Sequence, residues 1–86
     1  MGKFDKLVTR LLSGTSDKNF NFHDLLTILK KLGFEERTKG SHRIFYKKDI
    51  EEIVNLQPKK DGNAKPYQVK QVREIILKYR LLMQNK

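Results

Sequence analysis

The sequence contains no cysteine, which excludes a disulfide framework and any metal site built from thiolates. It has neither an apolar signal core near its start nor a hydrophobic run long enough to span a membrane. Without those signals, the expected location is the cytoplasm. Glycine-rich phosphate loops and the HExxH motif are also missing, so the signatures of P-loop proteins and zinc hydrolases are absent. We expect no cofactor.

Residues that carry other enzyme chemistries are equally scarce. The two histidines, His23 and His42, fall in different predicted elements, so no set of metal ligands is expected. Ser41 and His42 are neighbours on a predicted strand, where adjacent side chains point to opposite faces, so they make a poor catalytic pair. Acidic residues cluster at positions 49–52, and a turn followed by an edge strand with a charged rim explains them.

The chain carries a large excess of positive charge: 19 Lys and Arg against 10 Asp and Glu give a formal charge of +9 over 86 residues. Its 37% hydrophobic and 34% charged residues suit one small folded domain rather than a disordered tail. A basic domain of this size attracts polyphosphates such as RNA without sequence preference. Acidic proteins and anionic membranes are attracted as well, so charge alone does not select the partner.

An amphipathic helix is predicted over residues 4–12, where apolar residues recur at the i, i+3, i+4, i+7 and i+8 spacing. Gly14 stands where a C-terminal cap belongs, and a polar linker without apolar residues follows it. We therefore predict an N-terminal helix and linker at residues 1–19 and a main domain at residues 20–86.

Two further helices flank the centre of the chain. The first of them is capped by Asn21 and ended by Gly33. The last helix begins at Pro66, because proline suits the first turn of a helix. Its apolar stripe is predicted to belong to the core and comprises Val69, Val72, Ile75, Ile76, Tyr79, Leu82 and Met83.

Between these helices the hydrophobic period changes to the two-residue period of strands. Three antiparallel strands are predicted, at residues 34–39, 42–48 and 52–57. In the third strand Val54 and Leu56 share a face, which we assign to the core. The predicted fold class is α+β: a three-stranded antiparallel sheet with helices on one face, its other face open, plus an additional N-terminal helix.

Residues 39–47 carry the clearest functional signal. They place His42 directly after a Gly-Ser corner, and cations recur every four residues around it. A histidine in this setting can move a proton near neutral pH while the cations hold a phosphate. The alternative is an ordinary hairpin with a solvated histidine. Strand alternation separates His42, Ile44 and Tyr46 from their neighbours, but the sequence does not tell which set faces outward.

One chemistry is possible with these few groups: RNA cleavage by internal transfer, in which the 2′-hydroxyl of the RNA is the nucleophile. The protein then needs no nucleophile and no metal. It needs an acid or base near neutral pH, for which His42 fits, and cations around the phosphorus. A single general catalyst of this kind adds ~10²–10⁴-fold, which predicts a slow nuclease.

Several motifs together resemble the HicA toxins. They are Gly-Ser-His-Arg-Ile-Phe-Tyr at residues 40–46, the preceding helix end Leu-Gly-Phe at 32–34, a strand stopped by Pro58, and a helix that begins with Lys-Pro at 65–66. The resemblance runs from about Phe22 to Leu82. HicA toxins are small mRNA interferases of bacterial type II toxin–antitoxin pairs, with a fold similar to the double-stranded-RNA-binding domain.

The resemblance implies functions for particular residues. The catalytic histidine of the family corresponds to His42, and its glycine corner corresponds to Gly40 and Ser41. The implied partners are RNA and a HicB-like antitoxin that covers the active face. Together with the cations singled out above, the residues expected to contact RNA phosphates are Lys39, Gly40, Ser41, Arg43, Lys47, Lys59, Lys60 and Lys65.

The sequence departs from the family in two places. Family members commonly begin at the equivalent of the second helix, so the helix at residues 4–12 and its linker are extra. The family also often has a glycine-containing turn after the second strand, where this chain has Lys-Asp-Ile-Glu at residues 48–51.

The leading interpretation is a metal-independent endoribonuclease toxin in which His42 acts as general acid and base. A second interpretation is a non-catalytic module that uses the same scaffold to bind RNA. A third is a protein-interaction domain that docks through its N-terminal helix. The histidine after the Gly-Ser corner favours the first interpretation over the second, whereas the basic loop at residues 59–65 serves either.

Overall fold

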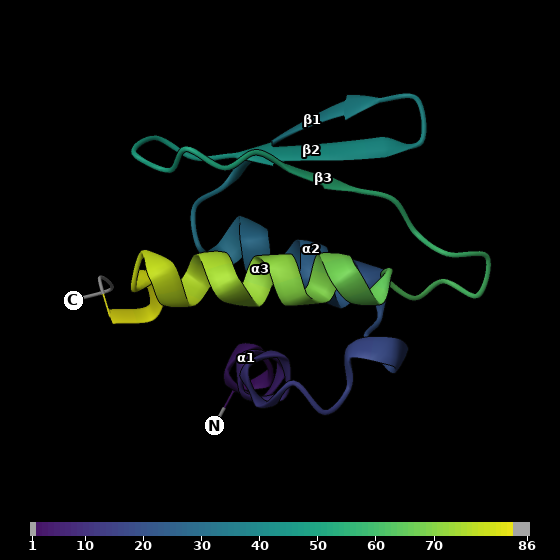
Figure 1. Ribbon diagram of the computed structural model, residues 1–86, viewed down its shortest axis with the longest axis horizontal. Coiled ribbons are helices and arrows are strands. Elements are labelled where there is room, and N and C mark those ends of the chain that lie inside the picture. Colours follow the sequence, from purple (N-terminus) through teal and green to yellow (C-terminus); the bar gives the residue numbers. More distant parts are fainter. Residues whose placement is uncertain (1, 84–86) are drawn as a thin grey trace.

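The computed structural model describes residues 2–83 and has three layers (Figure 1). A three-stranded sheet lies on one side of two helices, α2 (Phe22–Lys31) and α3 (Pro66–Lys78). A further helix, α1 (Lys3–Ser13), lies on the far side of α2 and α3. No helix of the described residues covers the other face of the sheet. Short 3-10 helices span Asp17–Asn19 and Leu81–Met83.

The local sequence explains where the helices begin and end. The side chain of Asn21 accepts a hydrogen bond of 3.1 Å from the backbone N–H of Asp24, which satisfies a first-turn donor of α2. Pro66 occupies the first turn of α3, where its missing N–H costs nothing. Gly14 ends α1 with a φ of 73°, in the left-handed region that glycine adopts without strain. The predicted helix limits are confirmed at these positions.

The sheet is an antiparallel meander of β1 (Glu35–Lys39), β2 (His42–Tyr46) and β3 (Val54–Leu56), in that spatial order. A two-residue turn joins β1 to β2, and Lys39 pairs with His42 across it. Gly40 is the first central residue of this turn and has a φ of 61°. Two-residue hairpin turns need a positive φ at that position, which explains the glycine.

All three strands are shorter than predicted: β1 begins at Glu35 rather than at residue 34, and the other two lose more residues. The ladder between β2 and β3 contains only three pairs, from Arg43–Leu56 to Phe45–Val54, so residues 52, 53 and 57 lie outside the strand. Beyond Tyr46 the chain turns through Asp49, whose φ is 73°. That turn takes residues 47 and 48 out of β2.

The core lies between the sheet and the helices. Phe45, Val54 and Leu56 are fully buried on the sheet side. The stripe predicted on the last helix is confirmed for its buried members Val69, Val72, Ile75 and Ile76, while Tyr79 and Leu82 are partly buried against the core. The side chain of Met83 lies outside the described part of the chain.

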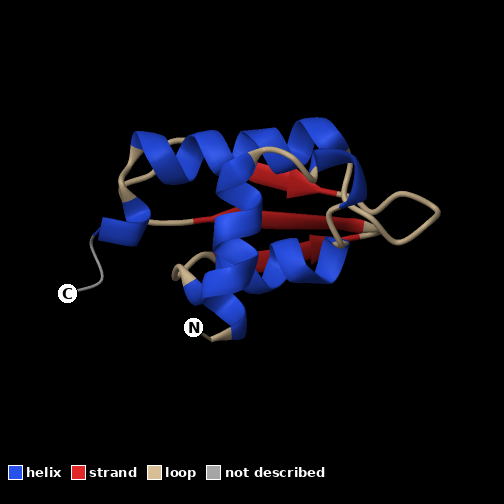
Figure 2. Ribbon diagram, turned by 90° about the horizontal axis from the view of Figure 1, so that it is seen from below, coloured by secondary structure: helices blue, strands red, loops and turns tan. Residues whose placement is uncertain are grey.

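Helix α1 crosses α2 and α3 on the side away from the sheet (Figure 2). Its buried residues Leu7, Val8 and Leu11 belong to the same hydrophobic cluster as the rest of the core. The guanidinium of Arg73, on α3, donates to both carboxylate oxygens of Asp17 at 2.9 and 3.1 Å and to the carbonyl of Leu11 at 3.2 Å. The boundary predicted after residue 19 stays a prediction.

The fold class is confirmed. The protein is α+β, with the α-β-β-β-α order and one-sided sheet of a double-stranded-RNA-binding-domain-like fold, plus the N-terminal helix α1. None of the described helices has the length and apolar composition that crossing a bilayer requires.

Candidate active site

The burial of Phe45 decides which residues of β2 face outward. Phe45 is fully buried between the sheet and the helices, so its strand neighbours Ile44 and Tyr46 point to the open face. His42, two residues before Ile44, shares that face and is exposed. The imidazole therefore lies on the side of the sheet that no described helix covers.

An asparagine on β3 holds the His42 ring. Val54 and Leu56 point into the core, so Asn55 between them points to the open face, where it pairs with Ile44 across the ladder. The Nδ1 atom of His42 lies 2.9 Å from the Oδ1 atom of Asn55. Because an amide oxygen only accepts, this bond requires a proton on Nδ1 and leaves Nε2 as the acceptor nitrogen of the neutral ring.

Two cavities meet at this pair, and His42 and Asn55 line both. The first cavity, of about 430 Å³, is also lined by Lys39, Gly40 and Ile44. The second, of about 290 Å³, lies between β3 and α3. The imidazole thus stands between a cavity that contains a cation and a second one on its other side.

Arg43 lies on the opposite face of the sheet from His42. It pairs through β2 with Thr38 and shares the helix-side face with Glu36, whose carboxylate accepts a hydrogen bond from its guanidinium. Lys30 of α2 lies 3.0 Å from the other oxygen of Glu36. The hydrogen bonds from Arg43 and then from Lys30 hold the pKa of Glu36 below its ordinary value of 4.5. The structure does not bring Arg43 to the imidazole.

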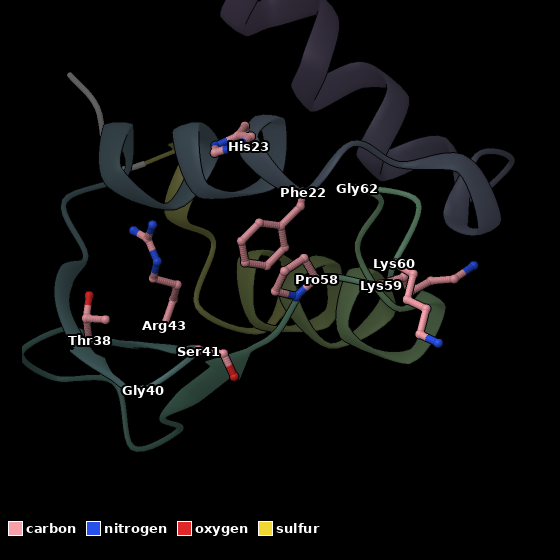
Figure 3. Close-up of a pocket in the computed structure, with 10 residues that line it drawn as sticks. All are labelled: Phe22, His23, Thr38, Gly40, Ser41, Arg43, Pro58, Lys59, Lys60 and Gly62. Carbon is pink, nitrogen blue, oxygen red and sulfur yellow. The ribbon is translucent and has the colours of Figure 1, made fainter.

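A basic cavity of about 450 Å³ opens on this helix side of the hairpin (Figure 3). Figure 3 shows the Arg43 side chain directed from β2 toward α2, whereas Lys59 and Lys60 point away from the cavity. Its walls include His23 from the first turn of α2 and the corner residue Ser41. His42 does not line this cavity. Lys59 and Lys60, two of the predicted RNA-contacting residues, therefore line the cavity that contains Arg43 and neither of the cavities beside His42, and their charged ends point away from it.

The remaining predicted contacts are spread along the molecule. The Nζ atom of Lys47 lies against Gly33, so close that a Cβ added there would come within 2.9 Å of it. Lys65 donates to the Oε1 atom of Gln57 at 3.4 Å, and Gln57 donates to the hydroxyl of Ser41 at 3.2 Å. Of the eight predicted phosphate contacts, the cavity around His42 contains Lys39 and Gly40.

Several residues around His42 and the open face were not singled out from the sequence. Asn55 is one, although the assignment of Val54 and Leu56 to the core already implied that it points outward. Arg37 is another: its guanidinium lies 5.7 Å from the centre of the Tyr46 ring, and it pairs with Ile44 beside His42 in the sheet. Tyr67 and Gln71 come from α3, so only the packing of that helix against β3 reveals them.

Within residues 2–83, no group of three His, Asp or Glu side chains is arranged to hold a metal ion. The acids predicted to form a charged rim are partly engaged. The carboxylate of Glu52 accepts hydrogen bonds from Lys78, at 2.8 Å, and from the hydroxyl of Tyr79. Those bonds, the one from Lys78 first, lower the pKa of Glu52 to about 2. Glu52 is thus tied to the end of α3, away from the imidazole.

A family model described as "HicA toxin of bacterial toxin-antitoxin" matches residues 22–78. The match covers more than half of the 86-residue chain and extends from the first residue of α2 to the last residue of α3. It includes His42 and Asn55 and leaves out α1. The curated proteins and the solved structures compared with the chain give no match.

Proposed function

The chain belongs to the HicA toxin family of bacterial toxin–antitoxin systems, whose members generally cleave mRNA, and we propose that it is a metal-independent endoribonuclease in which His42 is the general acid and base. The observation that carries the proposal is the bond between His42 Nδ1 and Asn55 Oδ1. It leaves Nε2, which has no partner among the described residues, as the basic nitrogen on the open face.

The proposed reaction is an internal transfer. Nε2 of His42 accepts the proton of an RNA 2′-hydroxyl while the 2′-oxygen forms a bond to the adjacent phosphorus. The bond from phosphorus to the 5′-oxygen breaks, and the imidazolium or a water molecule returns a proton to that oxygen. The products are a 2′,3′-cyclic phosphate and a free 5′-hydroxyl. Asn55 is a positioning residue, because it accepts from Nδ1–H in both charge states of the ring.

The phosphate needs a cation, because negative charge grows on its oxygens as the phosphorus becomes five-coordinate. Lys39 lines the same cavity as His42 and is its direct partner across β1 and β2. Arg37, on the same face of β1, extends the positive surface along the sheet. We assign Lys39 to the reacting phosphate and the lysines near residue 60 to more distant phosphates of the strand.

The test is incubation of the purified protein with an unstructured RNA in excess EDTA. Wild-type protein should cut the RNA, and His42→Ala should lose ~10²–10⁴-fold in rate. His23→Ala is the control, because His23 is also exposed but lies on α2 in the helix-side cavity, away from the open face; its loss should leave the rate of the cleavage step at saturating RNA unchanged. Strict dependence on magnesium, or full activity in His42→Ala, contradicts the proposal. RNA that is bound but never cut favours the non-catalytic binding module.

We also propose that inhibition comes from a HicB-like antitoxin that covers the open face. The described part of the chain provides no lid there, and the residues around His42 carry cations that suit an acidic partner. The partner should compete with RNA, bind more weakly at high salt, and protect the backbone amides of residues 40–47 from hydrogen exchange. Protection confined to residues 4–12, with RNA cleavage intact, contradicts this arrangement.

A further inference from the structure

The second cavity beside His42 is a groove between the edge strand β3 and helix α3, with a volume of about 290 Å³. We call it the amide groove, because four of its seven lining residues carry a side-chain amide. Its members are His42, Ile53, Asn55, Gln57, Tyr67, Gln68 and Gln71. No carboxylate and no lysine or arginine is among these described lining residues.

Two of the largest exposed apolar side chains of the described residues stand on this groove. Tyr67 is 65% exposed and Ile53 is 62% exposed. Tyr67 lies on α3 and Ile53 next to β3, so they come from the two walls of the groove. Gln71 follows Tyr67 by one helical turn, which puts the amide and the aromatic ring side by side on α3.

Two of the amides serve the structure of the groove. Gln68 is 2% exposed, and both ends of its amide bond the edge of β3: Nε2 donates to the carbonyl of Asn55 at 3.0 Å, and Oε1 accepts from the backbone N–H of Gln57 at 3.4 Å. Gln57 is itself bonded to Ser41 and Lys65. These bonds fix α3 against the strand and hold the groove open beside the histidine.

The other two amides retain free hydrogen-bonding groups. Asn55 uses its oxygen for His42, and its NH₂ group makes no hydrogen bond to the described residues. Gln71 has no hydrogen-bond partner among those residues, so its donor and its acceptor are both available. A groove that offers an exposed aromatic ring together with unpaired amides matches the way single-stranded RNA bases are recognised, by stacking and by hydrogen bonds to the base edge.

We propose that the amide groove binds one unpaired nucleobase of the RNA, next to the phosphate that is cut, with Tyr67 stacked on the base and Gln71 on its edge. The proposal rests on the proposed function, since it takes His42 as the site of cleavage. His42 lines both this uncharged groove and the cavity of Lys39. The groove therefore suits the base, and the cavity of Lys39 suits the phosphate. The described lining residues include no cation to attract an acidic protein segment, and Lys65, which does not line the groove, directs its ammonium group to Gln57.

The experiment measures binding in the His42→Ala background, so it does not depend on catalysis. Short single-stranded RNAs that carry 2-aminopurine at successive positions are titrated with this variant, and quenching at one position reports stacking. Adding Tyr67→Ala should weaken RNA binding ~5- to 150-fold and remove the quenching, because an aromatic residue stacked on a base contributes that much. Adding Tyr67→Phe, which keeps the ring, should preserve both.

Leu77→Ala is the matched control, because Leu77 is 60% exposed on the same helix and does not line the groove. It should leave affinity and quenching unchanged. Adding Gln71→Ala should reduce the difference in affinity among four RNAs that vary only at the quenched position. Equal affinity and quenching with Tyr67→Ala overturn the proposal. A Tyr67→Ala protein that loses antitoxin binding but keeps RNA binding overturns it too, because the groove is then a protein contact.

Failure of the groove and failure of the nuclease are separate results. If wild-type protein does not cut RNA but the 2-aminopurine probe is quenched through Tyr67, the result supports the groove as a base-binding site and contradicts the catalytic proposal. If RNA cleavage requires His42 but quenching never depends on Tyr67, the result supports the catalytic proposal and contradicts the groove assignment.

Discussion

Replacing Arg73 by methionine should lower the free energy of unfolding by more than a typical substitution near the surface does. The guanidinium makes three hydrogen bonds, two of them to Asp17 and one to the carbonyl of Leu11. The side chains of Arg73 and Asp17 are only 15% and 22% exposed. After the substitution, water therefore has little access to the carboxylate and the carbonyl that lose their hydrogen bonds. The hydrogen bond to Asp17 raises the pKa of Arg73, so the guanidinium stays charged.

The expected loss lies between the values for exposed and for buried ion pairs. Exposed pairs contribute up to about 1 kcal/mol, and removing one partner of a buried pair costs about 3–5 kcal/mol. For this partly buried, bidentate ion pair we expect the free energy of unfolding to fall by about 2–3 kcal/mol. That loss lowers the urea midpoint by about 1–2 M while the slope m stays unchanged. Lys70→Met, an exposed change one turn earlier on the same helix, is the control and should shift the midpoint little.

A double-mutant cycle with Asp17→Asn isolates the pair. We expect a coupling free energy of about 1–2 kcal/mol between the two positions, measured by urea unfolding followed by circular dichroism. An Arg73→Met protein within about 0.5 kcal/mol of wild type would refute this reasoning.

Three further predictions concern the site and its surroundings. Asn55→Ala should lower the single-turnover rate at saturating RNA by ~2- to 12-fold, the equivalent of one hydrogen bond to His42, and Asn55→Asp, which keeps the acceptor, should retain the rate. Lys39→Gln should reduce the slope of log K against log salt for single-stranded RNA by ~0.7, whereas an unchanged slope contradicts a phosphate contact. Because Lys78 lowers the pKa of Glu52 from 4.5 to about 2, the stability from this contact is present above pH 4.5 and lost toward pH 2. Urea unfolding at pH 6 and pH 3 should therefore show a smaller difference between wild type and Glu52→Gln at the lower pH.

Much of the fold follows from local sequence, because helix caps and the alternation of strands depend on near neighbours. Asn21 and Gly14 fix helix ends through their own side-chain and backbone properties, so these helix ends are predictable from the sequence. The length of β3 is not predictable from local sequence, because it depends on how many residues of β2 pair with it. The strand ends where pairing ends, and β-propensity does not report that.

The site was predictable only in part, for a related reason. The recurrence of cations every four residues suggested a cluster around His42, but a strand alternates with period two, and Arg43 therefore faces the helices. The outward direction of His42 is set by the burial of Phe45, a tertiary effect. Tyr67 lies 25 positions further along the chain than His42 and reaches the site through the packing of α3 on β3.

The chemistry of the cut ends tests the central claim most directly. Wild-type protein is incubated with a single-stranded RNA in EDTA, and the fragments are weighed by mass spectrometry. Internal transfer without a metal predicts a 2′,3′-cyclic phosphate, or the 3′-phosphate that forms when it hydrolyses, on one fragment and a free 5′-hydroxyl on the other. A 5′-phosphate with a 3′-hydroxyl, or no cleavage until magnesium is restored, would show that water and not the 2′-hydroxyl attacks, and would contradict the role assigned to His42.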